Sequence, residues 1–300
     1  MVSNQTITLI LETPQPYRFD LFYDIHARYP RRALFALNDG HYMRHMRFSD
    51  NHLYAVDISV GADGQLRAVV HNAKDEAYHR QQLRHLLGLD ANTEAFYTFA
   101  QATPALWYVV EPLFGLPLYR SENLYEALIF VIIEQHISWV SAQRAQQTLV
   151  NLGYEKRAVL MPPEELANKT VDDLKPLKIT FRRMNLLISI AQQIVDGTLP
   201  VSEWQDLAPD DLYDKLLAIK GVGHWTASVV VARATGQYRF VPHNDVALQA
   251  AVARYFDTEK SPDATKAVFE AFGEHAGLAA HFTLMHWVLD EYPVRDSAEF

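Results

Sequence analysis

Apolar residues recur with a helical period from Thr93 towards the end of the chain, and this periodicity restricts the fold more than any other feature of the sequence. The breaks between periodic segments carry proline, glycine or helix-capping residues, among them Gly197 and Pro242. The pattern therefore predicts a large helical body. We expect helices at residues 93–102, 123–134, 138–152, 180–197, 209–219, 224–235, 245–256, 262–274 and 279–290.

The first 90 residues have a mixed pattern. A cluster of turn residues, Gly61-Ala62-Asp63-Gly64, separates two alternating segments and predicts a β-hairpin. A further alternating segment lies near the N-terminus, and two other segments have helical spacing. The expected strands are Thr6–Leu11, 53–60 and 65–71, and the expected helices are 19–29 and 76–87.

These two patterns divide the chain into two expected parts. Residues 1–110 are predicted to form an N-terminal α+β domain together with connecting helices. Residues 111–300 are predicted to form a helical domain. The fold class is therefore mainly α, with a small sheet-containing domain in front of a helical body.

Composition excludes several classes of protein. The net charge of −9 argues weakly against a nucleic-acid partner, although an acidic chain can still hold DNA through backbone amides and a local basic strip. The absence of cysteine excludes disulfides, thiolate zinc sites and iron–sulfur clusters. The longest apolar run, Ala127–Ile133, is far shorter than the roughly 20 residues of a membrane span. We expect no membrane contact and no metal site.

The richest local motif is Gly221-Val222-Gly223, which follows one expected helix and precedes another. Two glycines around one aliphatic residue permit a tight turn and leave no Cβ in the way of an approaching ligand. The second helix begins there with unpaired N–H groups and a positive dipole end, which suits a phosphate, and Lys220 adds charge. The alternative is that the motif is only a structural turn between helices.

The residues around this turn, Leu216-x-x-Ile219-x-Gly221-Val222-Gly223-x-Trp225-Thr226-Ala227, resemble the hairpin of the 3-methyladenine DNA glycosylase II family in the helix-hairpin-helix superfamily. The resemblance implies a body of two helical lobes in which backbone amides of the turn hold a DNA phosphate. It also implies that turn carbonyls can hold a monovalent cation, and we expect no required cofactor. The residues assigned in this way are Lys220, Gly221, Val222, Gly223, His224 and Thr226 for DNA, and Leu217, Ile219 and Val222 for the cation.

Asp245 follows Pro242 and begins the next expected helix. The ordinary interpretation is that Asp245 or Asn244 is an N-cap. The same position also suits catalysis, because the helix dipole favours an anion there and base excision leaves a positively charged sugar that a carboxylate can stabilise. The family places its catalytic aspartate on the helix after the hairpin, behind a proline-containing loop. The resemblance therefore implies that Asp245 is the catalytic residue.

Position 225 predicts the type of reaction. Members of the superfamily that also cut the DNA strand place a lysine at this point of the hairpin helix, where it forms a Schiff base. Here the residue is Trp225, and Lys220 lies on the other side of the glycines. The resemblance therefore implies a monofunctional enzyme without lyase activity.

A third segment, Ile132-x-x-Gln135-x-x-Ser138, resembles the helix–turn–helix with which this family faces DNA. The resemblance implies that Gln135 and His136 bind DNA and that His136 fills the space left by a flipped base. A plain surface histidine is the alternative for His136, and Ser138 suits an N-cap equally well.

Aromatic residues supply candidates for the base pocket, since an electron-rich ring attracts a cationic alkylated base. Trp225 is the first candidate because it lies beside the hairpin, and Trp139 and Tyr108 are the others. Relatives often carry a second aromatic residue just before the last helix. The matching stretch, Gly277–Phe282, has none at the expected place, so the pocket shape is open.

These motifs together predict a monofunctional DNA glycosylase of base-excision repair. Its expected reaction is hydrolysis of the N-glycosidic bond of alkylated purines, of the 3-methyladenine type, in damaged double-stranded DNA. We expect a monomer that works in a bacterial cytoplasm with the nucleoid or in a nucleus. Two alternatives stay open: a glycosylase for another lesion, and a non-catalytic helix-hairpin-helix DNA-binding protein.

Overall fold

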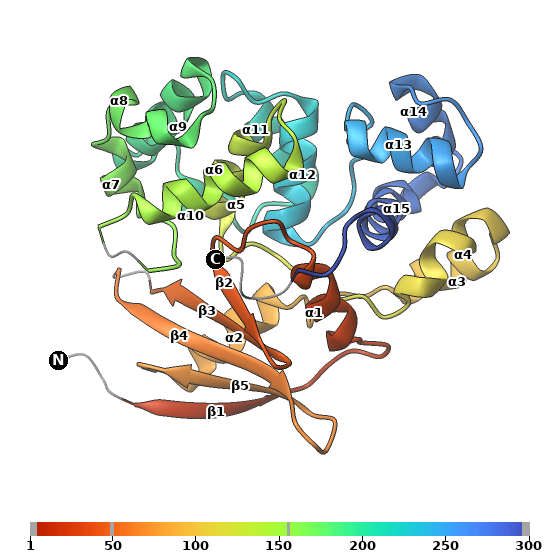
Figure 1. Ribbon diagram of the computed structural model, residues 1–300, viewed down its shortest axis with the longest axis horizontal. Helices are drawn as coiled ribbons and strands as arrows, with labels where there is room; N and C mark the ends of the chain where they lie inside the picture. The colour runs from red at the N-terminus through yellow and green to blue at the C-terminus, as the bar shows by residue number, and fades with distance from the viewer. Residues whose placement is uncertain (1–4, 49–50, 155–156, 296–300) are drawn as a thin grey trace.

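The computed structural model describes residues 5–48, 51–154 and 157–295. A small antiparallel sheet near the N-terminus lies beside a larger set of helices, as Figure 1 shows. The protein is therefore mainly α, as the periodicity predicts. No helix in these ranges is long and apolar enough to cross a membrane.

Each helix expected from the sequence is present, with small differences at the ends. Several of their N-termini are fixed by capping side chains, such as Asn123 before α5, Ser138 before α6 and Thr180 before α9. Four short helices, α4, α7, α8 and α10, were not expected. The helices are α1 (Phe19–Ala27), α2 (Glu76–Leu86), α3 (Glu94–Gln101), α4 (Pro104–Val110), α5 (Leu124–Glu134), α6 (Trp139–Asn151), α7 (Pro163–Ala167), α8 (Val171–Leu174), α9 (Phe181–Val195), α10 (Val201–Trp204), α11 (Pro209–Leu217), α12 (His224–Thr235), α13 (Val246–Tyr255), α14 (Pro262–Glu270) and α15 (Ala276–Glu291).

The sheet has five antiparallel strands in the order β1-β5-β4-β3-β2. The predicted strand at the N-terminus and the predicted hairpin are confirmed as β1 and as β4 with β5. Strand register puts alternate residues on the buried face, so that Val56 and Ile58 of β4 lie in the core. The strands are β1 (Thr6–Leu11), β2 (Phe35–Asn38), β3 (His41–Arg47), β4 (Leu53–Val60) and β5 (Leu66–His71).

Strands β2 and β3 are not among the strands expected from the sequence. They form a hairpin around Asp39 and Gly40, which both have positive φ angles of 46° and 79°. The buried face of β3 consists of Tyr42, Arg44 and Met46. A buried arginine in the middle of that face removes the alternation of apolar and polar residues by which a strand is recognised.

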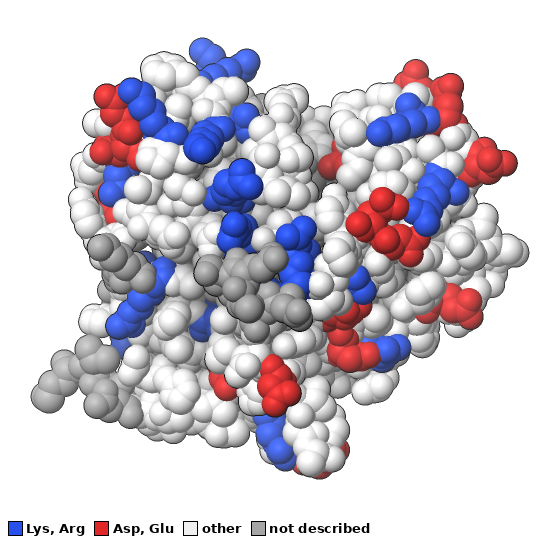
Figure 2. All heavy atoms as spheres, viewed as in Figure 1, with Lys and Arg blue, Asp and Glu red and all other residues white. Residues whose placement is uncertain are grey.

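The helices outside the N-terminal part form two hydrophobic clusters. The first contains residues of α5, α6, α9, α11 and α12, and the second contains residues of α3, α4, α13 and α15. Helices α3 and α4, grouped in the sequence analysis with the N-terminal part, therefore share their core with the C-terminal helices. Figure 2 shows a notch in the outline of the molecule between the α11–α12 side and the α13–α14 side.

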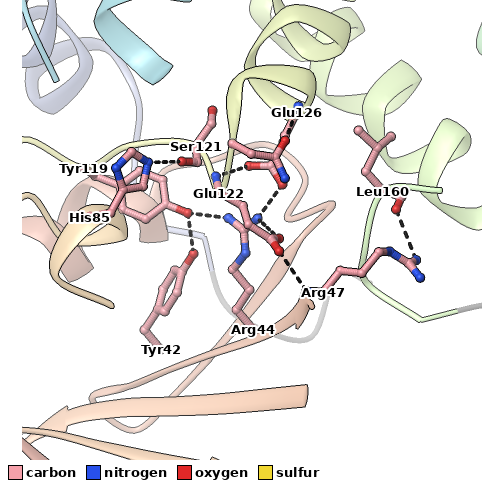
Figure 3. Close-up of polar contacts among 10 residues, drawn as sticks. Tyr42, Arg44, Arg47, His85, Tyr119, Ser121, Glu122, Glu126 and Leu160 are labelled. Carbon is pink, nitrogen blue, oxygen red and sulfur yellow. Dashed lines mark hydrogen bonds and ion pairs between the residues drawn. The ribbon is translucent and has the colours of Figure 1, made fainter. Parts of the chain in front are cut away.

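A buried charged network joins the sheet to the helices (Figure 3). The Arg44 guanidinium of β3 donates hydrogen bonds to the carboxylates of Glu122 and Glu126. It also donates one to the hydroxyl of Tyr119, at 2.7 Å. Glu122 also accepts the backbone N–H of Arg47 at 2.7 Å. Burial raises the pKa of Glu122 to about 7, while the positive charge of Arg44 opposes that rise. The network therefore links β3 to the start of α5.

A buried histidine in the sheet domain predicts how stability depends on pH. Burial lowers the pKa of His26 from 6.5 to about 4, and its Nδ1–H donates to the carbonyl of Phe22 at 2.7 Å. Because the folded-state pKa is lowered, stability is complete above about pH 6.5 and falls by about 1.4 kcal/mol per pH unit below it. We expect His26→Phe, which does not titrate, to lose about 2 kcal/mol less than the wild type between pH 7 and pH 5 in urea unfolding. An equal loss in both proteins would contradict this prediction.

Candidate active site

The predicted hairpin is present between α11 and α12. Gly221 has a φ of +99°, and a Cβ added there would lie 2.9 Å from Leu186 of α9, so this position requires glycine. A Cβ at Gly223 would meet no atom within 4 Å, and Gly223 is exposed. Val222 is buried, so only its backbone can meet a ligand. The first bond to a helix carbonyl runs from Ala227 to Gly223, at 2.9 Å.

This geometry leaves the turn open to an anion. The N–H groups of residues 223–226 precede the first helical hydrogen bond, and the positive end of the α12 dipole lies there. Lys220, exposed on the preceding turn, has no ion-pair partner among the described residues. The turn therefore has the properties expected of a phosphate-binding site.

Asp245 is the N-cap of α13. Its Oδ1 accepts the backbone N–H groups of Ala247 and Leu248 at 2.8 and 2.9 Å. Its Oδ2 accepts the indole N–H of Trp225 at 2.9 Å. The capping interpretation is thus correct in geometry, and it does not compete with catalysis, because the carboxylate is only half-buried and Oδ2 keeps a free lone pair.

Trp225 lies in the first turn of α12, and its ring packs against the first helical cluster. Its contact with Asp245 joins the hairpin helix to the carboxylate, which the sequence alone did not reveal. Trp225 therefore holds the candidate catalytic group in place. Stacking of this ring on a base stays a prediction.

The segment after α5 also reaches the hairpin. The side-chain nitrogen of Gln135 donates to the Gly221 carbonyl at 3.1 Å and to the hydroxyl of Thr226 at 2.9 Å. Thr226 is only 3% exposed. Both side chains therefore bond within the protein and hold the turn in place. DNA binding by Gln135 and Thr226 stays a prediction. His136, by contrast, is exposed and has a φ of +53°, a strained conformation at a loop tip.

His224, predicted to bind DNA, has both ring nitrogens occupied. Nε2–H donates to the Val241 carbonyl at 2.8 Å, and the Tyr213 hydroxyl donates to Nδ1 at 2.6 Å. Burial lowers the pKa of His224, and a second histidine, His243, packs its ring 4.7 Å away. Its ring therefore links both hairpin helices to the loop before Asp245, and only its backbone N–H is left for DNA.

The other two pocket candidates lie near further aromatic rings. Tyr108 is 63% exposed and packs near Tyr255, at the C-terminal end of α13. The ten residues of α13 separate that end from Asp245 by about 15 Å, so Tyr108 is not part of this cluster. Trp139 packs on Tyr29 and Tyr292, with ring centres 5.1 and 4.6 Å away.

The stretch compared with the family's second aromatic was misplaced. Helix α15 begins at Ala276, so Gly277–Phe282 lies within the helix rather than before it. In this helix the ring of His281 packs on the ring of Tyr238, with the ring centres 4.2 Å apart.

An ion pair that the sequence did not reveal joins Glu134 of α5 to Arg233 of α12 through two hydrogen bonds of 2.7 and 2.8 Å. Its partners are 99 residues apart, beyond the reach of any local pattern.

No family model matches the chain. Several curated relatives do match, and two of them are described below. The chain is 25% identical over 207 residues, or 68% of its length and 72% of the relative, to YfjP of Bacillus subtilis, which carries the name of a DNA-3-methyladenine glycosylase. It is 28% identical over 167 residues to the DNA-3-methyladenine glycosylase of the same organism, covering 53% of this chain and 55% of that protein.

Solved structures share the fold. The 3-methyladenine DNA-glycosylase of Archaeoglobus fulgidus superposes with a TM-score of 0.77 at 20% identity, covering 95% of this chain and 98% of that one. The 8-oxoguanine glycosylase/lyase of Clostridium acetobutylicum, in complex with double-stranded DNA, gives a TM-score of 0.64 at 14% identity, covering 84% and 97%. The fold is thus shared by glycosylases with different substrates.

Proposed function

Since this chain belongs to the helix-hairpin-helix DNA glycosylase superfamily, we propose that it is a monofunctional base-excision enzyme for alkylated purines in duplex DNA, of the 3-methyladenine II type. The observation that carries the proposal is the position of Asp245. Its carboxylate accepts hydrogen bonds from Trp225 of the hairpin helix and from two backbone amides of α13. Names of relatives support the substrate class.

The proposed reaction uses Asp245 as the charged group. The bond between the sugar and the base breaks with its electron pair leaving on the base, and an alkylated purine leaves readily because it is already cationic. The sugar then carries positive charge, which the Asp245 carboxylate stabilises while water adds and releases a proton to solvent. Trp225 and the two amides keep the carboxylate fixed, so little reorganisation is needed.

DNA binding is proposed to use three parts of the described site. The amides of residues 223–226 bind one phosphate, His136 fills the gap left by the flipped base, and the two helical clusters act as the two lobes. The turn carbonyls suit a monovalent cation. The Ile219 carbonyl accepts only the Val222 N–H, at 3.0 Å, and the carbonyls of Leu217 and Val222 accept no hydrogen bond from the described residues. Such a cation would add positive charge at the phosphate. The enzyme is proposed to act as a monomer where the DNA is, in the cytoplasm or a nucleus.

Base release from methylated duplex DNA tests the proposal. We expect purified protein to release 3-methyladenine without cutting the strand, and borohydride to trap no covalent protein–DNA complex, because Trp225 offers no amine. Strand cutting or trapping would contradict the monofunctional part. Release only from oxidised or deaminated bases would assign another lesion, and DNA binding with no release from any lesion would favour a binding protein.

A further inference from the structure

Four exposed basic side chains near the hairpin have no acidic partner among the described residues. Many other cations of the described residues are paired, such as Lys169 with Glu165 and Lys175 with Asp172. A charge that is not neutralised within the protein is available for an external anion. The four residues, which we call the basic strip, are Arg144 of α6, Lys178, Arg182 of α9 and Lys220.

Contacts place the elements of the strip side by side. Gly221 packs against Leu186, which lies one helical turn after Arg182. Arg183, the next residue, donates to the carbonyl of Ile133 at 3.0 Å, close to the loop that carries His136. Helix α6 packs against the turn Lys175–Leu177, just before Lys178. The strip therefore adjoins both the hairpin turn and the loop of His136.

The surroundings of the strip carry little negative charge. The sequence has no Asp or Glu between Asp173 and Asp196. Figure 2 shows Lys and Arg side chains over the region that Figure 1 labels α6 and α9, while Asp and Glu gather towards α13–α15. Phe181, the first residue of α9, is 66% exposed between Lys178 and Arg182, where an apolar ring can pack on a sugar.

We propose that the basic strip binds the sugar–phosphate backbone of duplex DNA beyond the phosphate held by the hairpin. The choice of partner rests on the proposed function, and the geometry supplies the site. Several phosphates spaced along a strand match several cations spread over adjacent elements better than a single small anion does. The strip also explains how a chain of net charge −9 can hold DNA, because the positive charge is local and lies on elements that adjoin the turn.

Salt dependence of binding tests the strip without any base release. Affinity for a short undamaged duplex is measured by fluorescence anisotropy over a range of salt concentrations. We expect Lys178→Ala/Arg182→Ala to bind roughly tenfold more weakly at low salt and to lower the slope of log K against log salt by about two, one per lost phosphate contact.

The matched control is Arg84→Ala/Lys260→Ala, which removes two exposed cations that also lack a partner among the described residues but lie on α2 and after α13. It should keep the wild-type slope. Equal slopes for the strip variant and the wild type would overturn the strip, even if base release is observed. A lowered slope with no base release from any lesion would support the strip and overturn the proposed enzyme.

Discussion

Asp245→Asn is expected to slow release of methylated bases by at least about 100-fold while leaving the protein folded. Asparagine is as good an N-cap as aspartate, so the bonds from Ala247 and Leu248 to the side-chain oxygen can be kept. What is lost is the negative charge next to the developing positive charge on the sugar, together with the bond from the Trp225 indole N–H, because the amide nitrogen that replaces Oδ2 cannot accept it. The rate is measured under single-turnover conditions on methylated duplex DNA, so that binding does not limit it.

A second aspartate offers a matched control. Asp75 caps α2 in the same way as Asp245 caps α13, with its Oδ1 accepting the N–H groups of Ala77 and Tyr78 at 2.7 and 3.2 Å. Asp75→Asn makes the same chemical change far along the chain from the hairpin and should leave base release at the wild-type rate. Full activity of Asp245→Asn would show that Asp245 is only a cap.

The hairpin and the cap of α13 could be predicted because each depends on a few consecutive residues. Position 221 has a positive φ and close packing, which call for glycine, and Asp245 follows a proline at the start of a helix. Both features can be recognised from residue types at neighbouring positions. The motifs also came in an order that a known family shares. Local chemistry and resemblance were therefore enough to find the candidate site.

The contacts inside the site could not be predicted, because they join residues far apart in the chain. Gln135 bonds to Gly221 across 86 residues, and Trp225 to Asp245 across 20. Sequence position does not say whether a polar side chain bonds within the protein, as those of Thr226 and His224 do. The missed β2–β3 hairpin has the same origin, since Arg44 is buried only because distant carboxylates pair with it.

Arg44→Met is expected to lower the free energy of unfolding by about 3–5 kcal/mol, the second large effect that the structure predicts. The Arg44 side chain is 1% exposed, and those of Glu122 and Glu126 are 5% and 6% exposed. Without the guanidinium, two carboxylates remain buried with no counter-charge, and the Tyr119 hydroxyl loses a donor. The loss is measured by urea unfolding, with Arg84→Met on the exposed face of α2 as the matched control.

The pH dependence separates this charge effect from a loss of packing. Without Arg44 the Glu122 carboxyl group must take up a proton to stay buried, which costs little at pH 5 and more with each unit above the pKa of an exposed glutamate. Burial already raises the pKa of Glu122 to about 7 in the presence of Arg44. The difference between wild type and Arg44→Met should therefore grow from pH 5 to pH 8, and adding Glu122→Gln/Glu126→Gln should remove that growth. A difference that is the same at both pH values would mean that Arg44 contributes by filling space rather than by its charge.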